Sequence, residues 1–211
     1  MKTSCLLLPI LCLLVATDKV LWEEHFDGRL QPGWQWVRED AAEWRIRDDH
    51  LEVRSQPGRI WSGNDAKNLL LRSPPEGEEL AATVSVAHEP AGQWEQAGLL
   101  WYVDDDRFVK LISEHIDGEM YVVTACEQQN RGTVVGKVKV PSANIQLRLL
   151  VQGRRVTGQW RLEPGDAWSD AGTVEFTVPD RPRFGLFTQC GSADEVRWVR
   201  FDDFAISAPG R

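Results

Sequence analysis

The chain has 211 residues and a formal net charge of −8 at pH 7. That length is enough for one domain with a sizeable core. The acidic balance, without a basic run, argues against nucleic acid and anionic membrane surfaces as partners. Ten tryptophans against two tyrosines is typical of a β-sheet core or of a surface that binds flat partners such as sugar rings.

The first residues have the pattern of an export signal. Lys2 supplies a positive charge, and residues 6–15 are almost wholly apolar but too few to span a bilayer. We therefore expect residues 1–17 to be a signal peptide and residues 18–211 to be a single domain. The protein would be secreted or periplasmic, with no membrane contact after cleavage. A buried N-terminal strand or helix is the alternative for this segment.

Short β-like segments, separated by turn residues, follow one another along the rest of the chain. In chain order we expect strands at 20–26, 34–38, 43–46, 50–54, 68–72, 80–88, 97–103, 108–114, 120–126, 133–140, 145–152, 155–162, 173–178, 183–190 and 196–206. No segment has an apolar stripe of helical period and length. The pattern predicts an all-β fold, a two-sheet antiparallel β-sandwich of jelly-roll type.

The segment 93–114 reads as a central hairpin whose acidic turn is Asp104–Asp106. Its second strand alternates, with Val109, Leu111 and Ser113 on one face and Phe108, Lys110, Ile112 and Glu114 on the other. Because side chains of a strand point to opposite faces in turn, this strand should bury one face and offer the other to a ligand.

Cysteine usage leaves two alternatives open. Cys5 and Cys12 belong to the expected signal, and Cys126 and Cys190 remain in the domain. Both stand at the ends of expected strands. In an exported protein they could form a disulfide or stay as two separate buried thiols.

Three segments carry a family resemblance. They are FDG with W-x-W at 26–36, QAGLLWYVDDDRFVKLISE at 96–114, and RFGLFTQC with VRFDDFAI at 183–206. Through them the chain resembles the DUF1349 family of the concanavalin A-like lectin/glucanase superfamily. That domain is similar to the C-terminal β-sandwich of family 43 β-xylosidases. The resemblance implies an exported sandwich with a concave face, used in glycan processing, and implies no known reaction.

The acidic residues favour a protein that is not an enzyme. Glucanases of this superfamily carry E-x-D-x-x-E on one strand, and no such run occurs here. Glu114 is the lone acid of its expected face, and Glu95 has the opposite parity to Gln96. A glycoside hydrolase needs two carboxylates in one cleft. The alternatives kept open are a hydrolase with acids assembled around Glu114, and a structural or protein-interaction module.

A structural calcium ion is a further alternative. Glu24, Asp27, Asp202 and Asp203 lie on the first and last expected strands or beside them, and carboxylate oxygens suit calcium. Solvated edge and turn residues would show the same pattern. We assign no cofactor and no metal ligand from the sequence.

Carbohydrate is the partner that the sequence favours. Sugars are bound by aromatic faces and by planar amide, carboxylate and guanidinium groups. The candidate ligand-binding residues are Gln96, Tyr102, Phe108, Lys110, Glu114, Arg148 and Gln189. The tryptophans beside expected turns, which could form an aromatic rim, are Trp34, Trp36, Trp61, Trp94 and Trp168.

Lys110 and Glu114 pose a specific geometric question. They share a face but stand four residues apart, which is about 13 Å along a strand at about 3.3 Å per residue. They cannot pair directly within one strand, so each needs a partner on a neighbouring strand or a ligand.

Overall fold

The computed structural model describes residues 17–129 and 131–210, so the expected signal, apart from Thr17, lies outside the described residues. The described chain forms β1 (Lys19–Glu24), β2 (Trp34–Val37), β3 (Trp44–Arg47), β4 (His50–Arg54), β5 (Leu69–Arg72), β6 (Glu79–Ala87), β7 (Gln96–Asp104), β8 (Arg107–Ile116), β9 (Glu119–Gln128), β10 (Arg131–Lys139), β11 (Ile145–Gln152), β12 (Arg155–Arg161), β13 (Ser169–Glu175), β14 (Arg183–Gln189) and β15 (Trp198–Ala208). The described part of the chain contains no helix long and apolar enough to cross a membrane.

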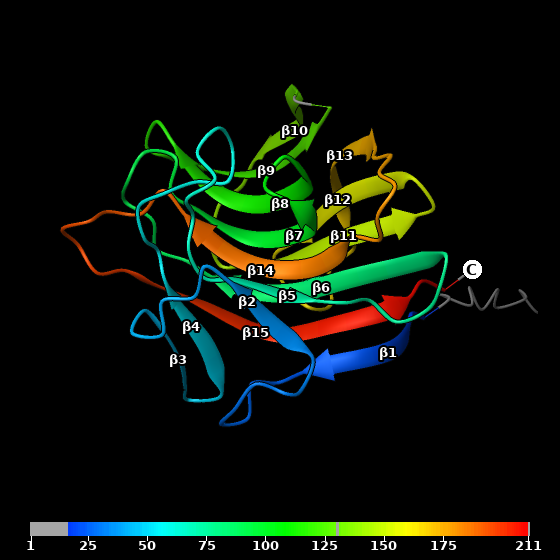
Figure 1. Cartoon of the computed structure of the whole chain (residues 1–211), viewed down its shortest axis with the longest axis horizontal. Coiled ribbons are helices and arrows are strands. Elements are labelled where there is room, and N and C mark those ends of the chain that lie inside the picture. The colour runs from blue at the N-terminus through cyan, green and yellow to red at the C-terminus, as the bar shows by residue number, and fades with distance from the viewer. Residues whose placement is uncertain (1–16, 130, 211) are drawn as a thin grey trace, which may run out of the picture.

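The strands form two sheets in which every pairing is antiparallel. The eight-stranded sheet has the order β13-β12-β11-β6-β15-β4-β3, with β1 paired to β15 outside this path. The seven-stranded sheet has the order β10-β9-β8-β7-β14-β5-β2. Figure 1 shows the curved strands β8, β7 and β14 of this second sheet side by side. The predicted two-sheet antiparallel β-sandwich is confirmed.

Alternating side chains build the core between the sheets. Leu99 of β7 and Leu111 of β8 point inward from the seven-stranded sheet and are fully buried. Leu147 and Leu149 of β11 point inward from the other sheet and belong to the same apolar cluster. Every second residue of these strands is therefore a core residue, as the two-residue period predicts.

The outer face of the seven-stranded sheet is also partly covered. Leu100, Phe108, Ile112 and Phe187 point away from the sandwich core, yet all are fully buried in a second apolar cluster. Ile60 belongs to this cluster and lies in the connection 55–68 between β4 and β5. The centre of this sheet is thus buried on both faces.

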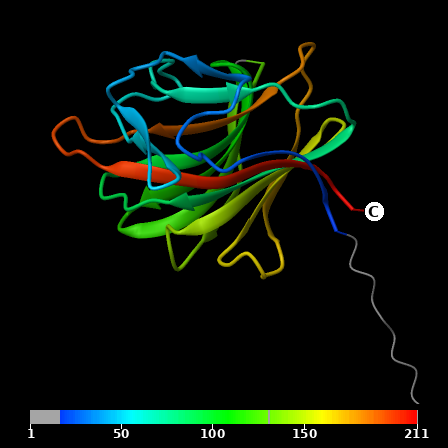
Figure 2. The ribbon, with the colours of Figure 1, turned by 90° about the horizontal axis from the view of Figure 1, so that it is seen from below.

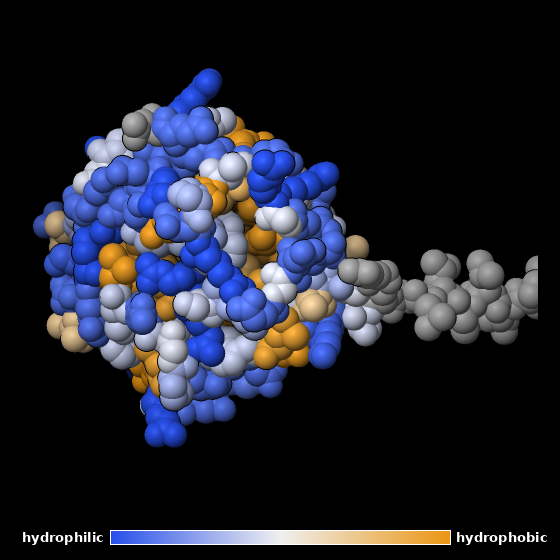
Figure 3. All heavy atoms as spheres, turned by 45° about the vertical axis from the view of Figure 1, so that its right-hand side comes forward, coloured by the Kyte–Doolittle hydropathy of each residue, from blue (hydrophilic) through white to orange (hydrophobic). Residues whose placement is uncertain are grey.

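The ends of the described chain lie together. β1 pairs with the last part of β15, with Lys19 opposite Ala208, so both ends leave the sandwich on one side (Figure 2). In the space-filling view, hydrophobic residues form limited groups among hydrophilic ones (Figure 3).

The cysteines are not bonded to each other. Cys126 and Cys190 are both free. Cys126 belongs to the core between the sheets, whereas Cys190 follows β14 directly. Of the two alternatives left open by the sequence, two separate thiols is the one that the structure shows.

We expect Leu99→Ala to lower the free energy of unfolding by about 2–5 kcal/mol, because it leaves a cavity between the sheets. Urea denaturation followed by tryptophan fluorescence measures the change. Leu162→Ala is the matched control, since Leu162 is 37% exposed, and should change stability by less than about 0.5 kcal/mol. Equal losses in the two variants would contradict the core assignment.

Candidate functional site

A pocket of about 500 Å³ opens on the outer face of the seven-stranded sheet. Strands β7, β8, β9, β10 and β14 supply part of its wall, and the segments around Trp61 and Trp94 supply the rest. Its lining residues are Arg59, Trp61, Ser62, Gln93, Trp94, Gln96, Lys110, Glu114, Ile116, Val123, Ala125, Val134, Lys137, Gln189 and Cys190. The pocket therefore borders the covered apolar cluster, through Ile116 and Val123.

A buried polar network forms one wall of the pocket. Gln96 Oε1 accepts hydrogen bonds from Lys110 Nζ at 2.9 Å and from Gln189 Nε2 at 2.7 Å. The same amide donates through Nε2 to Glu114 Oε1. Gln189 Oε1 in turn accepts from the Ile60 amide at 3.0 Å. One amide on β7 thus connects Lys110 with Glu114, and it is the cross-strand partner that their spacing requires.

Strand register explains why these four residues meet. Gln96 stands directly opposite Glu114 of β8 on one side and opposite Gln189 of β14 on the other. Lys110 is four residues before Glu114 on β8, so it points to the same face. All four are at most 5% exposed.

Burial perturbs both charged groups of the network. Burial lowers the pKa of Lys110 to about 8, against the opposing effect of Glu114. Burial raises the pKa of Glu114, while Lys110 and the Gln96 hydrogen bond act in the opposite direction. Each charge favours the ionised form of the other. The pair is therefore close to neutral as a unit, and the remaining charge of the pocket lining comes from Arg59 and Lys137.

Two tryptophans contribute to the pocket wall. The ring of Trp61 lies 5.0 Å from Lys110 Nζ, within the range of a cation–π interaction. It also rests against Gly132 of β10, where an added Cβ would come within 2.4 Å of the ring. A residue with a side chain would push Trp61 away. Trp94 is 50% exposed and presents a large apolar surface to solvent.

Trp94 has a backbone conformation that needs support. Its φ is 66°, in the left-handed region that residues with side chains rarely adopt. The Trp94 amide donates to the carbonyl of His115 at 2.9 Å, and the His115 amide donates to the carbonyl of Glu95 at 3.1 Å. These bonds attach the segment before β7 to the end of β8.

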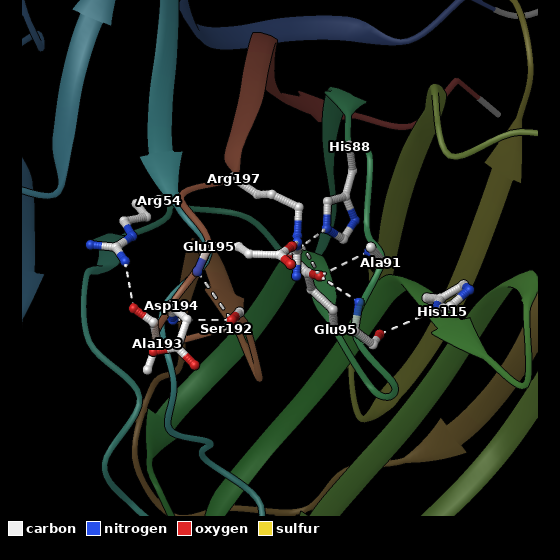
Figure 4. A network of polar contacts seen from close by, with 11 residues as sticks. Arg54, His88, Ala91, Glu95, His115, Ser192, Ala193, Asp194, Glu195 and Arg197 are labelled. Atoms are coloured by element: carbon white, nitrogen blue, oxygen red, sulfur yellow. Dashed lines mark hydrogen bonds and ion pairs between the residues drawn. The ribbon is translucent and has the colours of Figure 1, made fainter.

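The neighbouring residue, Glu95, supports the same segment from the opposite face (Figure 4). Its fully buried carboxylate accepts hydrogen bonds from the amides of Ala91 and Gly92, each at 3.1 Å. Arg197 Nε donates to it at 3.1 Å, and His88 Nε2 lies 3.8 Å away. Glu95 therefore positions the loop that carries Trp94, and does not line the pocket.

The pKa of Glu95 reflects these contacts. Burial alone would raise it, but the His88 ring and the Gly92 and Ala91 amides outweigh burial and lower it to about 2. The carboxylate is thus ionised in the folded protein over the whole neutral and mildly acidic range.

The structure brings four of the seven candidate ligand-binding residues to the pocket and leaves three elsewhere. Phe108 and Tyr102 have the expected parity, but they belong to the apolar cluster. The Tyr102 hydroxyl donates to Asp105 Oδ1 at 2.9 Å. Arg148 lies on the other sheet, where it pairs with Asp18 at 2.7 Å. The expectation that Arg148 joins the other six on one face is wrong, because β11 belongs to the eight-stranded sheet.

The aromatic rim is smaller than predicted. Trp61 and Trp94 line the pocket. Trp34 and Trp36 pack against the core between the sheets, and Trp168 lies under the guanidinium of Arg161 at 4.2 Å. Sequence reasoning missed Arg59 and Lys137, which line the pocket from a connection and from β10. No sequence signal marked them, since both are ordinary exposed cations.

The residues considered for calcium already have protein partners or solvent. The Glu24 carboxylate accepts from the amides of Phe26 and Gln31 at 3.0 and 2.8 Å, and from Trp34 Nε1 at 3.1 Å. Within residues 17–129 and 131–210, no group of three or more His, Cys, Asp or Glu side chains is placed to hold a metal ion.

The carboxylates at the pocket bear on its chemistry. Among the described residues that line it, Glu114 is the single acid. Glu95 faces the opposite side of the sheet. The arrangement offers donors, acceptors and aromatic faces, but no second carboxylate to act with Glu114.

Comparison with known proteins gives a family and a fold. Residues 23–207 match the family model described as "Beta xylosidase C-terminal Concanavalin A-like domain". A comparison with curated proteins finds no match.

Solved structures with the same fold include parts of longer chains and chains of similar length. The GH43 protein BlXynB from Bacillus licheniformis has a TM-score of 0.78 at 20% identity, over 88% of this chain and 39% of that one. A functionally unknown protein from Saccharomyces cerevisiae has a TM-score of 0.65 at 14% identity, over 84% of this chain and 97% of that one. The CBM2 module of the evolved Dit of Lactobacillus casei BL23 phage J-1 has a TM-score of 0.61 at 10% identity, over 93% of this chain and 98% of that one.

We expect Glu95→Gln to destabilise the fold in a pH-dependent way. A carboxyl whose pKa falls from 4.5 in the unfolded chain to about 2 in the folded one stabilises the fold above pH 4.5. That stabilisation is on the order of 3 kcal/mol, and it disappears as pH falls from 4.5 towards 2. Unfolding free energies of the two proteins at pH 7 and pH 3 measure it.

The difference in the free energy of unfolding between wild type and Glu95→Gln should therefore be larger at pH 7 than at pH 3. Glu175→Gln, a change of an exposed acid on β13, controls for the lost charge. A gap that does not change with pH would contradict the role of the ionised Glu95.

Proposed function

Because this chain belongs to the family of the β-xylosidase C-terminal concanavalin A-like domain, we propose that it is an exported, non-catalytic carbohydrate-binding domain. The binding site is the pocket on the outer face of the seven-stranded sheet. A neutral sugar ring would lie against Trp94 and Trp61, with its hydroxyl groups towards Lys110 and Glu114. The DUF1349 assignment and export through residues 1–17 are parts of this proposal.

The chemical character of the pocket is the observation that carries the proposal. Sugar rings have apolar C–H faces, which aromatic rings cover, and hydroxyl groups that need both donors and acceptors. Exposed Trp94 stands beside a wall of two amides, an amine and a carboxylate.

The hydrogen-bond network supports a binding role through preorganisation. Gln96 is held by three hydrogen bonds to side chains on both neighbouring strands. Fixed donors and acceptors lose little conformational entropy when a ligand binds. A ligand that lacks a hydroxyl at the right place would leave buried polar atoms unpaired, and this discriminates between sugars.

The hydrolase alternative receives less support. Acid–base hydrolysis of a glycoside needs two carboxylates about 5 to 10 Å apart. Among the described residues that line the pocket, Glu114 is the one residue with a carboxylate. Glu114 also accepts a hydrogen bond from Gln96 and lies beside Lys110, as a positioned acceptor would.

The relatives are consistent with a binding role and define its context. This chain covers 39% of the length of BlXynB, so the activity of that whole GH43 protein is not transferred to it. The phage J-1 structure, described as a CBM2 module, has the same fold as a separate unit. A glycan context follows from these descriptions by analogy, and the pocket chemistry supports it independently.

We expect Trp94→Ala to weaken the binding of neutral xylo-oligosaccharides by at least about fivefold, because an aromatic contact of this kind contributes more than about 1 kcal/mol. Isothermal titration calorimetry with xylotetraose, followed by a wider panel of neutral glycans, measures it. Trp168→Ala is the matched control, because Trp168 directly precedes β13 of the other sheet, and this variant should bind like wild type. If wild type retains no neutral glycan, the structural or protein-interaction alternative replaces this proposal.

We expect Glu114→Gln to change affinity without changing turnover, since wild type should release no product from xylo-oligosaccharides or aryl glycosides. The substitution keeps the shape of the side chain but removes its charge and one acceptor. Product release is followed by chromatography and binding by calorimetry on the same preparations. Release by wild type that Glu114→Gln abolishes, with ligand still bound, would establish the hydrolase instead.

A further inference from the structure

A second pocket, of about 420 Å³, lies on the outer face of the eight-stranded sheet. Its floor is a row of residues in direct register across four strands. Arg45 of β3 stands opposite Glu52 of β4, Glu52 opposite Arg200 of β15, and Arg200 opposite Ala87 of β6. Because Ala87 is small, the row ends in a hollow next to Arg200.

One buried carboxylate fixes both arginines of the row. Glu52, with a side chain only 4% exposed, accepts from Arg45 Nε at 2.5 Å and from Arg200 Nε at 3.1 Å. Burial would raise the pKa of Glu52, but the two arginines outweigh it and lower the pKa. Arg45 is held further by Trp198, whose ring centre lies 4.0 Å from the guanidinium.

The outer ends of these arginines have no acceptor among the described residues. Both donate to Glu52 through Nε alone, and among the described residues neither uses its Nη groups in a hydrogen bond. Their side chains are 41% and 58% exposed. Two guanidinium groups therefore share one carboxylate, and positive charge is left over at the surface of a chain whose net charge is −8.

The other charged residues of this pocket do not cancel the positive charge of Arg45 and Arg200. Arg47, two residues after Arg45 on β3, is 61% exposed, and its one ion pair within the described part of the chain is with Asp48 at 3.4 Å. Arg197 is already paired with Glu95 and Glu195. Glu89 is the second acid of the lining. Exposed Val196 and the partly buried Trp198 add apolar surface beside the cations.

We propose that this pocket binds the carboxylate of an acidic sugar, with the carboxylate oxygens on the Nη groups of Arg200 and Arg45. The planar fork of arginine matches a carboxylate with two parallel hydrogen bonds. The hollow over Ala87 has room for the sugar ring, and Val196 and Trp198 meet its apolar edge. The choice of a sugar rests on the proposed function, but the site is a separate one on the opposite sheet.

A purely structural ion network is the competing explanation. Arginines and glutamates opposite one another on a sheet commonly form cross-strand pairs. Such a row would gain from the Nε contact of each arginine with Glu52, but it would make no use of their Nη groups and would not need a hollow beside them. The two explanations differ in what happens when an anionic ligand is added.

The test uses two matched probes on the full-length domain. One is a xylo-oligosaccharide with a glucuronic acid branch, and the other is the same molecule with its carboxyl group reduced to an alcohol. Calorimetry at low and physiological salt compares wild type with Arg200→Gln, Arg47→Gln and Trp94→Ala. Arg155→Gln, which removes an exposed arginine from β12 of the same sheet, controls for net charge.

We expect wild type and Arg155→Gln to bind the acidic probe about tenfold more tightly than the reduced one, as one charged hydrogen-bonded contact would give. Arg200→Gln should abolish this preference and Arg47→Gln should reduce it several-fold. Arg47 has no buried partner, so Arg47→Gln should not disturb the fold. A lowered preference in this variant therefore cannot be ascribed to misfolding, as it could be in Arg200→Gln. A preference that survives in both, or that Trp94→Ala removes instead, would overturn the proposal.

Free glucuronate and inorganic phosphate separate this site from the first pocket. Glucuronate should shift the NMR signal of the Trp198 indole N–H in wild type, even if no neutral sugar binds the protein. That result would support the second site while the proposed function fails. Phosphate should displace glucuronate only weakly. Displacement at equal concentration would identify an unselective oxyanion site and overturn the assignment to a sugar.

Discussion

The dryness of both faces of the seven-stranded sheet is the constraint on which the candidate site depends. β7 and β8 face the core of the sandwich on one side and a covered apolar cluster on the other. A polar side chain on such a sheet has little access to bulk water, and it is costly to leave unpaired. Gln96, Lys110, Glu114 and Gln189 are therefore joined in one network. The polar wall of the first pocket is therefore ordered by the fold itself.

The sequence predicted the parts of this arrangement that follow from alternation. Hairpin turns at Asp104–Asp106 and after Ile116 fixed the strands, and the two-residue period then placed Lys110 and Glu114 on one face. It also indicated that this pair needed a partner on another strand. The partner turned out to be Gln96, a residue already among the candidates, because antiparallel register sets it directly opposite Glu114.

Alternation predicts which residues of a strand share a face. It does not predict to which sheet the strand belongs, or which segment covers that face. Arg148 has a suitable outward position on its strand, yet β11 belongs to the other sheet. Tyr102 and Phe108 have the right parity, but the connection 55–68 brings Ile60 over them. Neither fact is local: one depends on the order of strands, and the other on how a long connection folds back. Trp94 and Trp61 could be named as turn tryptophans, while Trp34 and Trp36 could not be told apart from them.

Glu95 and Gln96 are neighbours that serve opposite faces of the sheet at the start of β7. Gln96 points into the pocket, and Glu95, its neighbour, points to the opposite side and anchors the loop at 91–94. The left-handed backbone of Trp94 costs free energy, and the contacts of the Glu95 carboxylate with His88 and with the Ala91 and Gly92 amides oppose that cost. The ion pair of Glu95 with Arg197 is by itself a weak source of stability. Its value here is that it holds an exposed aromatic ring at one position beside the pocket.

The charge arrangement at the two pockets separates binding from catalysis and one ligand type from another. In the first pocket Lys110 and Glu114 perturb each other's pKa and balance in charge, while the other two cations of the lining, Arg59 and Lys137, are exposed to solvent. In the second, one glutamate is shared by two arginines, so the field is positive. A domain that recognises a polymer with neutral residues and acidic branches would need both environments. Because they lie on outer faces of opposite sheets, they would bind separate parts of such a polymer, and the linkage would raise the affinity of each through effective concentration.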